Sequence, residues 1–265
     1  MAKSITGWIT INGTHIPLLD GESKSSAYDR LKEQYNKGKD KSNNIEKTVD
    51  SIIQKGEELD DMFKDSKYEK FSDKGQAIAN DFYTKMGYGG KPEVVSKEAY
   101  QKELANNKLG ELCRGIQASD SQMTNYMKQY KEGELHTSGS ADSAFGRGIY
   151  LTVGANAEEH ASGYGNQIMR CAIKNNSKVI TVEEIADKRK SILDNITQKR
   201  DKNIDKAFSE NNKELYTKAN DSYNKSMHIL SDNGYLAATL GYDAIIDKRQ
   251  GVLVVLNRKK MIFSD

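Results

Sequence analysis

Long apolar runs are missing from this sequence. No stretch approaches the ~20 apolar residues that a membrane-spanning helix needs, so we expect no contact with a membrane. The first residues, MAKSITGWITING, carry one lysine but no apolar core followed by small residues, so we expect no secretory signal peptide. Hydrophobic residues make up 36% and charged residues 29% of the chain, a balance typical of soluble proteins with long, solvated helices.

Cysteine, histidine and unbalanced charge are also scarce. Cys113 and Cys171 each lie in an apolar, strand-like segment, and we expect both to be reduced and buried. The four histidines are far apart in the sequence and none has a partner at helical or turn spacing, so we expect no metal site. Lysine and arginine (40) are interleaved with aspartate and glutamate (38), which argues against a strongly basic nucleic-acid groove. Nucleic acid stays open as the substrate of a small active site.

Two common catalytic motifs are absent. The segment GYGG at 87–90 lacks the lysine and the strand–turn–helix context of a phosphate-binding P-loop, and we interpret it as a turn. No serine lies in a Gly-x-Ser-x-Gly elbow, so an α/β-hydrolase has no support. Any chemistry therefore depends on other residues.

The amino-terminal third is predicted to be mainly helical. Residues 5–18 alternate apolar and polar side chains around an Asn-Gly pair, a pattern typical of a β-hairpin. From Asn43 apolar residues recur at helical spacing, and Asn43 with Glu46 predicts a capping box at the start of that helix. A second helix is predicted to open at Ser72 and to end at the turn cluster 87–92.

The rest of the chain is richer in strands. Strand-like segments are predicted at 111–116, 146–153, 167–173, 178–182, 240–246 and 251–263. Among them lies a lysine- and asparagine-rich insert, at about 183–232, whose apolar stripe breaks near 209–214 and predicts a helical hairpin. We therefore predict an α+β protein with a mainly helical region at 1–93 and a second domain at 94–265.

Three of these segments stand out by their order. They are LCRGI, with Arg114 and Gly115; FGRGIYLT, with Tyr150; and the final β-segments that follow Gln250. This order resembles the ADP-ribosyltransferase family, and FGRGIYLT is similar to a strand of its polymerase-like branch. The resemblance covers residues 94–265 without the insert. It implies an ADP-ribosyltransferase-like split β-sandwich that uses NAD as its substrate and needs no metal.

The resemblance also implies roles for single residues. Arg114 matches the family's polar residue that holds the NAD ribose or phosphates, and Gly115 beside it allows a ligand to approach closely. Tyr150 matches the tyrosine that stacks on nicotinamide, on a strand that Gly148 leaves bare. Tyr164, in ANAEEHASGYG, is expected near nicotinamide as well. Ser140 matches a serine that supports the site in the toxin-like branch, although its segment also fits a loop.

The family's catalytic glutamate has no counterpart. It belongs at or just before GVLVVLN, where Gln250 and Val252 share one face of the strand and only Gln250 is polar. A carboxylate stabilises the oxocarbenium-like ribose that forms when the nicotinamide–ribose bond breaks, whereas glutamine offers hydrogen bonds but no charge. We expect a rate lower by on the order of a hundredfold or more if Gln250 has replaced the acid.

Three explanations for the missing acid stay open. An acid from elsewhere enters the site, with Glu158, Glu159 and Asp247 as candidates; the domain is a weak or inactive relative; or the glutamine was introduced deliberately. The enzymatic hypothesis requires the catalytic residues Arg114, Tyr150 and Gln250 to converge on one cleft.

The first functional hypothesis is transfer of ADP-ribose from NAD to a macromolecular acceptor, as by a toxin or effector, with protein favoured over nucleic acid. GWITINGTHIPL and GKPEVVSKEAYQ also resemble segments of ADP-ribosyltransferase-type proteins encoded beside phage head genes. That resemblance implies action in the cytoplasm of a bacterial host, with phage head proteins as partners and delivery in the virion as one route. The alternatives are a catalytically inactive, head-associated structural or interaction protein, and an NAD glycohydrolase in which water replaces the acceptor.

Overall fold

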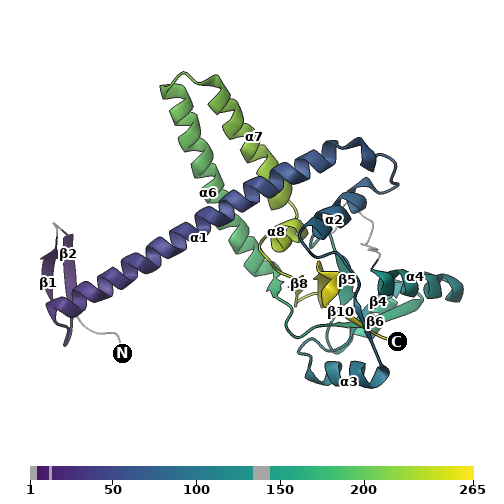
Figure 1. Cartoon of the computed structure of the whole chain (residues 1–265). Coiled ribbons are helices and arrows are strands. Elements are labelled where there is room, and N and C mark those ends of the chain that lie inside the picture. Colours follow the sequence, from purple (N-terminus) through teal and green to yellow (C-terminus); the bar gives the residue numbers. More distant parts are fainter. Residues whose placement is uncertain (1–4, 12–13, 134–143) are drawn as a thin grey trace. The chain divides into compact units, whose positions relative to one another are not determined.

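The computed structural model describes residues 5–11, 14–133 and 144–265 (Figure 1). The chain divides into two compact units, Met1–Thr48 and Val49–Asp265. Helices are combined with a two-stranded hairpin and a mixed eight-stranded sheet, so the predicted α+β class is confirmed.

The first unit contains the hairpin and the beginning of a long helix. Strands β1 (Ile5–Ile11) and β2 (Thr14–Leu19) pair antiparallel, which confirms the predicted hairpin; the Asn-Gly pair itself lies outside the described residues. Helix α1 (Lys24–Lys64) follows, and the predicted start at Asn43 is wrong. The reason is that residues 24–42 lack proline and include five lysines together with alanine, arginine, leucine, glutamate and glutamine, so good helix formers continue the helix where the apolar periodicity fades.

The second unit is built around the eight-stranded sheet. Its strands are β3 (Glu93–Val95), β4 (Leu112–Ile116), β5 (Ile149–Thr152), β6 (Gln167–Ile173), β7 (Val179–Thr181), β8 (Ala244–Asp247), β9 (Val252–Val255) and β10 (Met261–Ser264). Their order is β3-β10-β6-β4-β5-β9-β8-β7. The pairs β3–β10 and β7–β8 are parallel, and the other neighbours are antiparallel. The predicted strands 111–116, 146–153, 167–173 and 178–182 are confirmed, whereas the predicted segment 251–263 is two strands separated by the short helix η2 (Arg258–Lys260).

The sheet is almost divided into two four-stranded halves, β3-β10-β6-β4 and β5-β9-β8-β7. Strands β4 and β5, which adjoin in the middle, share the single residue pair Cys113↔Thr152, whereas β4 pairs with β6 over five residues and β5 with β9 over four. The hydroxyl of Thr152 donates to the carbonyl oxygen of Cys113 at 3.0 Å and reinforces this contact. We call this junction the seam.

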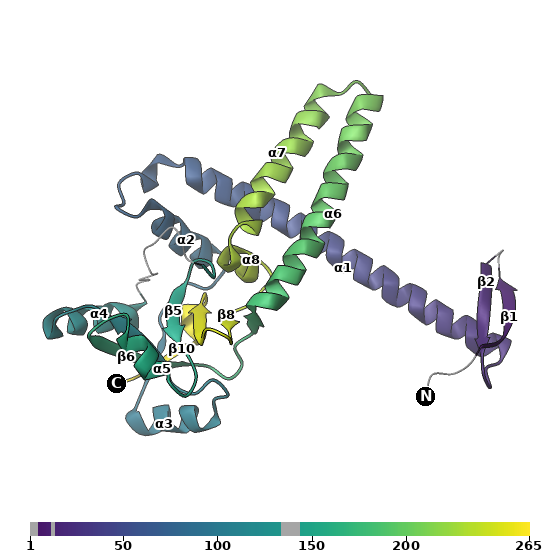
Figure 2. The same ribbon diagram turned by 180° about the vertical axis from the view of Figure 1, so that it is seen from behind.

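The same unit also contains helices. They are α2 (Lys74–Lys85), α3 (Lys97–Asn106), α4 (Asp120–Glu132), α5 (Ala157–Ser162), α6 (Val182–Ser209), α7 (Lys213–Leu230) and α8 (Asn233–Thr239), with the short η1 (Ser66–Tyr68) before α2. Helix α2 is capped by Asp73, one residue after the predicted Ser72. Helices α6 and α7 lie side by side and confirm the predicted helical hairpin (Figures 1 and 2).

One hydrophobic core joins the sheet to helices on both sides of the predicted domain boundary at residue 93. Ile52 and Leu59 of α1 and Phe82 of α2 belong to the same buried cluster as the central strands. Helix α1 also crosses α7 closely, because a Cβ at Gly56 would lie 2.4 Å from the carbonyl oxygen of Lys225. Residues 49–93 are thus part of the compact unit that holds the sheet.

Candidate functional site

Arg114 and Gly115 lie on β4 and face opposite sides of it. The Arg114 guanidinium carbon is 5.8 Å from the centre of the Tyr130 ring of α4, a cation–π geometry. On the other side, a Cβ at Gly115 would lie 1.9 Å from the carbonyl oxygen of Ala161 in α5. Helix α5 therefore fills the space that a side chain at position 115 would need, and this close packing explains why the residue is glycine.

Tyr150 is half-buried on β5, and its ring is tied to the turn before that strand. The phenol oxygen donates to the carbonyl oxygen of Gly146 at 2.8 Å. Gly146 has φ of 92°, and a Cβ there would lie 2.2 Å from the backbone nitrogen of Gly234 in α8. At Gly148 a Cβ would lie 2.5 Å from Cγ1 of Val254. Packing against α8 and β9 thus explains both glycines around Tyr150.

Gln250 is exposed in the turn between β8 and β9. The Asp247 carboxylate accepts the backbone N–H groups of Arg249 at 2.8 Å and Gln250 at 3.0 Å, which fixes the turn. The next residue, Gly251, has φ of 62°, and its carbonyl oxygen accepts the N–H of Val153 at 2.8 Å. The backbone at Gln250 is therefore held, while its side chain faces solvent.

Tyr164 follows α5 and is 64% exposed. Its ring centre is 5.7 Å from that of His160. Nδ1 of His160 would lie 3.9 Å from a Cβ at Gly251, beside Gln250. His160 thus connects Tyr164 with the β8–β9 turn. Sequence reasoning missed this position, because a single histidine on a short helix carries no signal of a neighbour far along the chain.

Two of the three candidate acids are engaged in structural contacts. Glu158 lies 2.5 Å from Arg170, and the hydrogen bond from that guanidinium lowers the pKa of Glu158. Asp247 is 9% exposed and holds the turn that contains Gln250. Glu159 is exposed and, with Glu158, lines a cavity of about 470 Å³ beside α5.

The pairing register shows how the predicted residues are arranged. Cys113, Thr152 and Val252 form one row across β4, β5 and β9. Arg114 and Tyr150 lie on one side of this row, and Gln250 lies two residues beyond it on the other.

At ~3.3 Å per residue, Tyr150 and Gln250 are about 13 Å apart along the strands. Arg114 faces away from Cys113, whereas Tyr150 shares the face of Thr152, because side chains alternate along each strand. The structure thus places the three segments on adjacent strands, directs Arg114 and Tyr150 to different faces, and gathers Gln250, His160 and Tyr164 at one end of β5. Arg114, Tyr150 and Gln250 therefore do not converge on one cleft in this structure. Ser140 lies outside the described residues.

A polar cluster at the amino end of β5 also escaped the sequence analysis. One Asp232 oxygen accepts the N–H groups of Arg147 at 3.2 Å, Gly234 at 2.7 Å and Tyr235 at 3.1 Å. The hydroxyl of Tyr83 donates to the carbonyl oxygen of Arg147, and burial raises the pKa of Tyr83 well above its usual value. These bonds fix the turn that contains Gly146, whose carbonyl oxygen accepts the Tyr150 hydroxyl. They join α2, this turn and the start of α8, which are far apart in the sequence.

Both cysteines are buried and free, as the sequence predicts. Among the residues that the structure describes, no three histidine, cysteine or acidic side chains are grouped to hold a metal ion. Within the same residues, no helix has the length and apolar character to cross a bilayer. Comparisons of the chain with protein-family models, with curated proteins and with solved structures found no match.

Proposed function

We propose that the second compact unit is an ADP-ribosyltransferase-like domain that binds NAD and transfers ADP-ribose, at an attenuated rate, to a macromolecular acceptor. The observation that carries the proposal is topological. Three motifs that are far apart in the sequence, at Arg114, at Tyr150 and after Gln250, occupy the adjacent strands β4, β5 and β9 in the middle of the sheet. The seam between β4 and β5 adds support, because it divides the sheet as a split β-sandwich requires.

The proposed roles follow the chemistry of the side chains. Arg114 binds the phosphates or ribose of NAD through its planar guanidinium, which requires the seam to rearrange, because Arg114 lies against Tyr130 on the face of the sheet opposite to Tyr150. Tyr164 and Gln250, which lie at the same end of β5, contact nicotinamide and the ribose. Tyr150 lies about 13 Å from Gln250 along the strands and must move closer to flank nicotinamide with Tyr164. NAD can bind beside Gly115 only if α5 moves away from β4, because the carbonyl oxygen of Ala161 in α5 now packs against this glycine.

The reaction breaks the bond between the nicotinamide nitrogen and the ribose C1′. Nicotinamide leaves as a neutral base, the acceptor's nucleophilic atom bonds to C1′, and the acceptor releases a proton. The ribose passes through an oxocarbenium-like state, which Gln250 solvates without supplying negative charge. We expect a rate on the order of a hundredfold below that of the same site with a carboxylate.

The biological setting is part of the proposal and rests on the resemblance alone. We propose action in a bacterial host's cytoplasm on an acceptor that is a protein rather than a nucleic acid, in association with phage head proteins.

A second candidate is a catalytically inactive structural or interaction protein that keeps the transferase-like fold. Two observations favour it. Asp247 and Glu158 are held in structural contacts, and α5 packs directly against Gly115, where it leaves no room for a ligand. An NAD glycohydrolase is distinguished from both by nicotinamide release that needs no acceptor.

The test measures NAD binding by calorimetry and nicotinamide release with and without bacterial lysate as the source of acceptor. The purified chain is compared with Gln250→Glu and with Lys248→Glu, which adds an acid to the same exposed turn two residues away. Release that rises about a hundredfold in Gln250→Glu and not in Lys248→Glu supports the proposal. No NAD binding and no release in any of the three proteins overturns it in favour of the structural candidate.

A further inference from the structure

The hairpin of the first compact unit has one strand edge that no other strand covers. Its sheet consists of β1 and β2, so β1 has β2 on one side and no strand of the described chain on the other. A two-stranded hairpin is only marginally stable by itself and gains from a further strand or a helix beside it. The two edges of this hairpin differ in how they meet that need.

The outer edge of β2 is closed by residues at the start of α1. Nη2 of Arg30 donates to the carbonyl oxygen of Pro17 at 2.9 Å. The carboxylate of Glu22, just before the helix, accepts the N–H of Leu19 at 3.0 Å. Pro17 itself has no N–H to offer. A further strand therefore cannot pair along β2.

The outer edge of β1 has its backbone groups directed outward. Trp8 lies opposite Pro17, whose carbonyl points to Arg30 and therefore away from β1. In an antiparallel pair, both residues of such a position direct their N–H and C=O groups away from each other, and the pattern repeats every second residue. The backbone groups of Trp8 and Thr10 thus point away from β2. The irregularity in the pairing at Thr6 affects only the beginning of this edge.

The sequence of β1 suits a second copy of the same strand. Natural edge strands usually carry lysine or proline, which prevent pairing with another chain, but ITGWITI contains neither and no charged residue. The order of its residues is also nearly the same in both directions from Trp8, with Thr6 and Thr10 at equal distances and an isoleucine at each end. An antiparallel copy centred on Trp8 therefore sets threonine opposite threonine and isoleucine opposite isoleucine, and it opposes no like charges.

We propose that the edge of β1 is an interface with a second copy of this chain, in which the two β1 strands pair antiparallel across a two-fold axis at Trp8. The product is a four-stranded sheet with the order β2-β1-β1-β2. Both of its outer edges are β2 strands, which Pro17 and Arg30 close. Because the same strand serves on both sides of the axis, the pairing closes on itself and the assembly stops at a dimer.

Sedimentation velocity of the full-length protein at about 1–100 µM tests the proposal, because a small interface is expected to dissociate in such a range. We expect a species of twice the mass of one chain that dissociates on dilution. Thr10→Pro should raise the dissociation constant about tenfold or more, because proline lacks the outward N–H and the two-fold axis doubles the loss.

The matched control is His15→Pro. His15 lies opposite Thr10, so its N–H points to the outer edge of β2, which the proposed interface does not use. The hairpin tolerates proline equally at both positions, since neither N–H serves the β1–β2 ladder. We therefore expect His15→Pro to dimerise like the parent protein. Circular dichroism checks that both variants keep the parent's fold.

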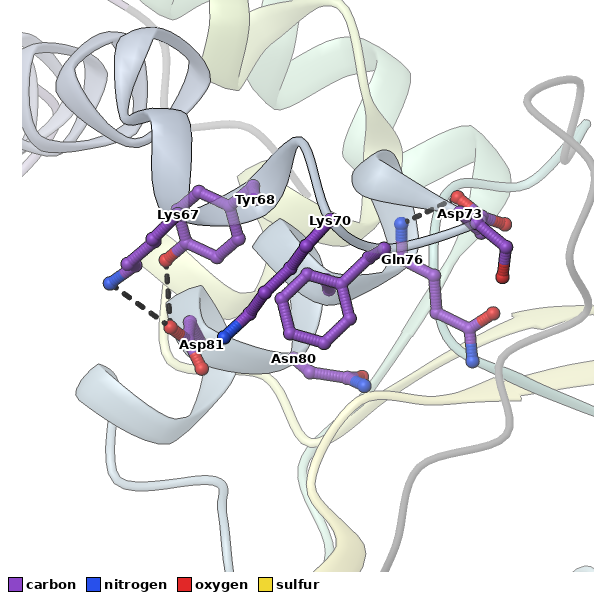
Figure 3. Close-up of a pocket in the computed structure, with 10 residues that line it drawn as sticks. Lys67, Tyr68, Lys70, Asp73, Gln76, Asn80 and Asp81 are labelled. Carbon is purple, nitrogen blue, oxygen red and sulfur yellow. Dashed lines mark hydrogen bonds and ion pairs between the residues drawn. The ribbon is translucent and has the colours of Figure 1, made fainter.

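Two exposed aromatic residues of the second compact unit provide further controls. Phe71, which lines a cavity between η1 and α2 (Figure 3), is 46% exposed, and Phe208 of α6 is 71% exposed. Phe71→Ala and Phe208→Ala should leave the dimer unchanged, and loss of the dimer in either would place the interface elsewhere. A monomer at every concentration would overturn the proposal. Equal effects of Thr10→Pro and His15→Pro, whether both weaken the dimer or neither does, would overturn it as well.

Discussion

Replacing Gly115 with alanine tests whether this glycine serves helix packing or ligand approach. The added Cβ would lie 1.9 Å from the carbonyl oxygen of Ala161, whereas ordinary contact begins at 3.4 Å. Helix α5 must therefore retreat from β4 by about 1.5 Å, which would open the small cluster that Cys113 forms with Ala157 and Ala161. Overpacking of this kind costs about 1–3 kcal/mol, and we expect the upper end because the obstacle is backbone and cannot change rotamer.

Urea unfolding followed by circular dichroism measures this effect. A loss of about 3 kcal/mol corresponds to a fall in Tm of about 6–12 °C for a unit of this size. Gly163→Ala is the matched control, because this glycine at the end of α5 has φ of −68° and a Cβ there would lie 3.3 Å from its nearest neighbour. We expect the control to stay within about 1 kcal/mol of the parent protein. A Gly115→Ala protein of unchanged stability that has lost NAD binding would refute the packing argument and favour a ligand role.

Three further changes test other parts of the fold. Asp60→Asn should destabilise the protein by about 1 kcal/mol near neutral pH, because Asp60 lies 2.6 Å from the Lys64 ammonium, whose hydrogen bond lowers the pKa of Asp60. The difference should shrink as the pH falls below about 4 and vanish only below the lowered pKa of Asp60, where the carboxylate is protonated in the folded protein as well. A difference independent of pH in urea titrations would contradict this. Asp232→Ala should cost about 2 kcal/mol in the same assay, because three backbone N–H groups lose their acceptor; a loss below about 0.5 kcal/mol would show that the cap is dispensable. Gly56→Ala should lower the Tm by several degrees because its Cβ meets the carbonyl oxygen of Lys225, and an unchanged Tm would mean that α1 does not cross α7 so closely.

Local sequence signals predicted much of the secondary structure. Strands β4, β6 and β7 are short apolar runs bounded by turn residues, and the break after Ser209 separates two regular apolar stripes. Helix α4 was not predicted, although Ser119 and Gln122 form a capping box at its start and Met123, Met127 and Tyr130 recur at helical spacing on its buried side. The sequence therefore carried the signal for this helix.

The contacts of the candidate site were not predictable in the same way. The sequence predicted that Gly115 allows a close approach, but it did not identify Ala161 as the neighbour, because that contact arises only when α5 packs on β4. The faces of Arg114 and Tyr150 depend on the register of the seam, which is set by one residue pair. His160 reaches the turn at Gly251 through tertiary packing, for which no local pattern exists.

The hairpin of α6 and α7 is an enlarged crossover. Strands β7 and β8 are parallel neighbours, and such a pair needs a connection of only about a dozen residues. Near the sheet, Ile185, Ile192 and Ile196 of the hairpin are buried in the hydrophobic core. At its far end, Phe208 is 71% exposed. The outer part is therefore a replaceable module: selection can lengthen it, shorten it or give it a new surface, one helical turn at a time, without altering the register of any strand.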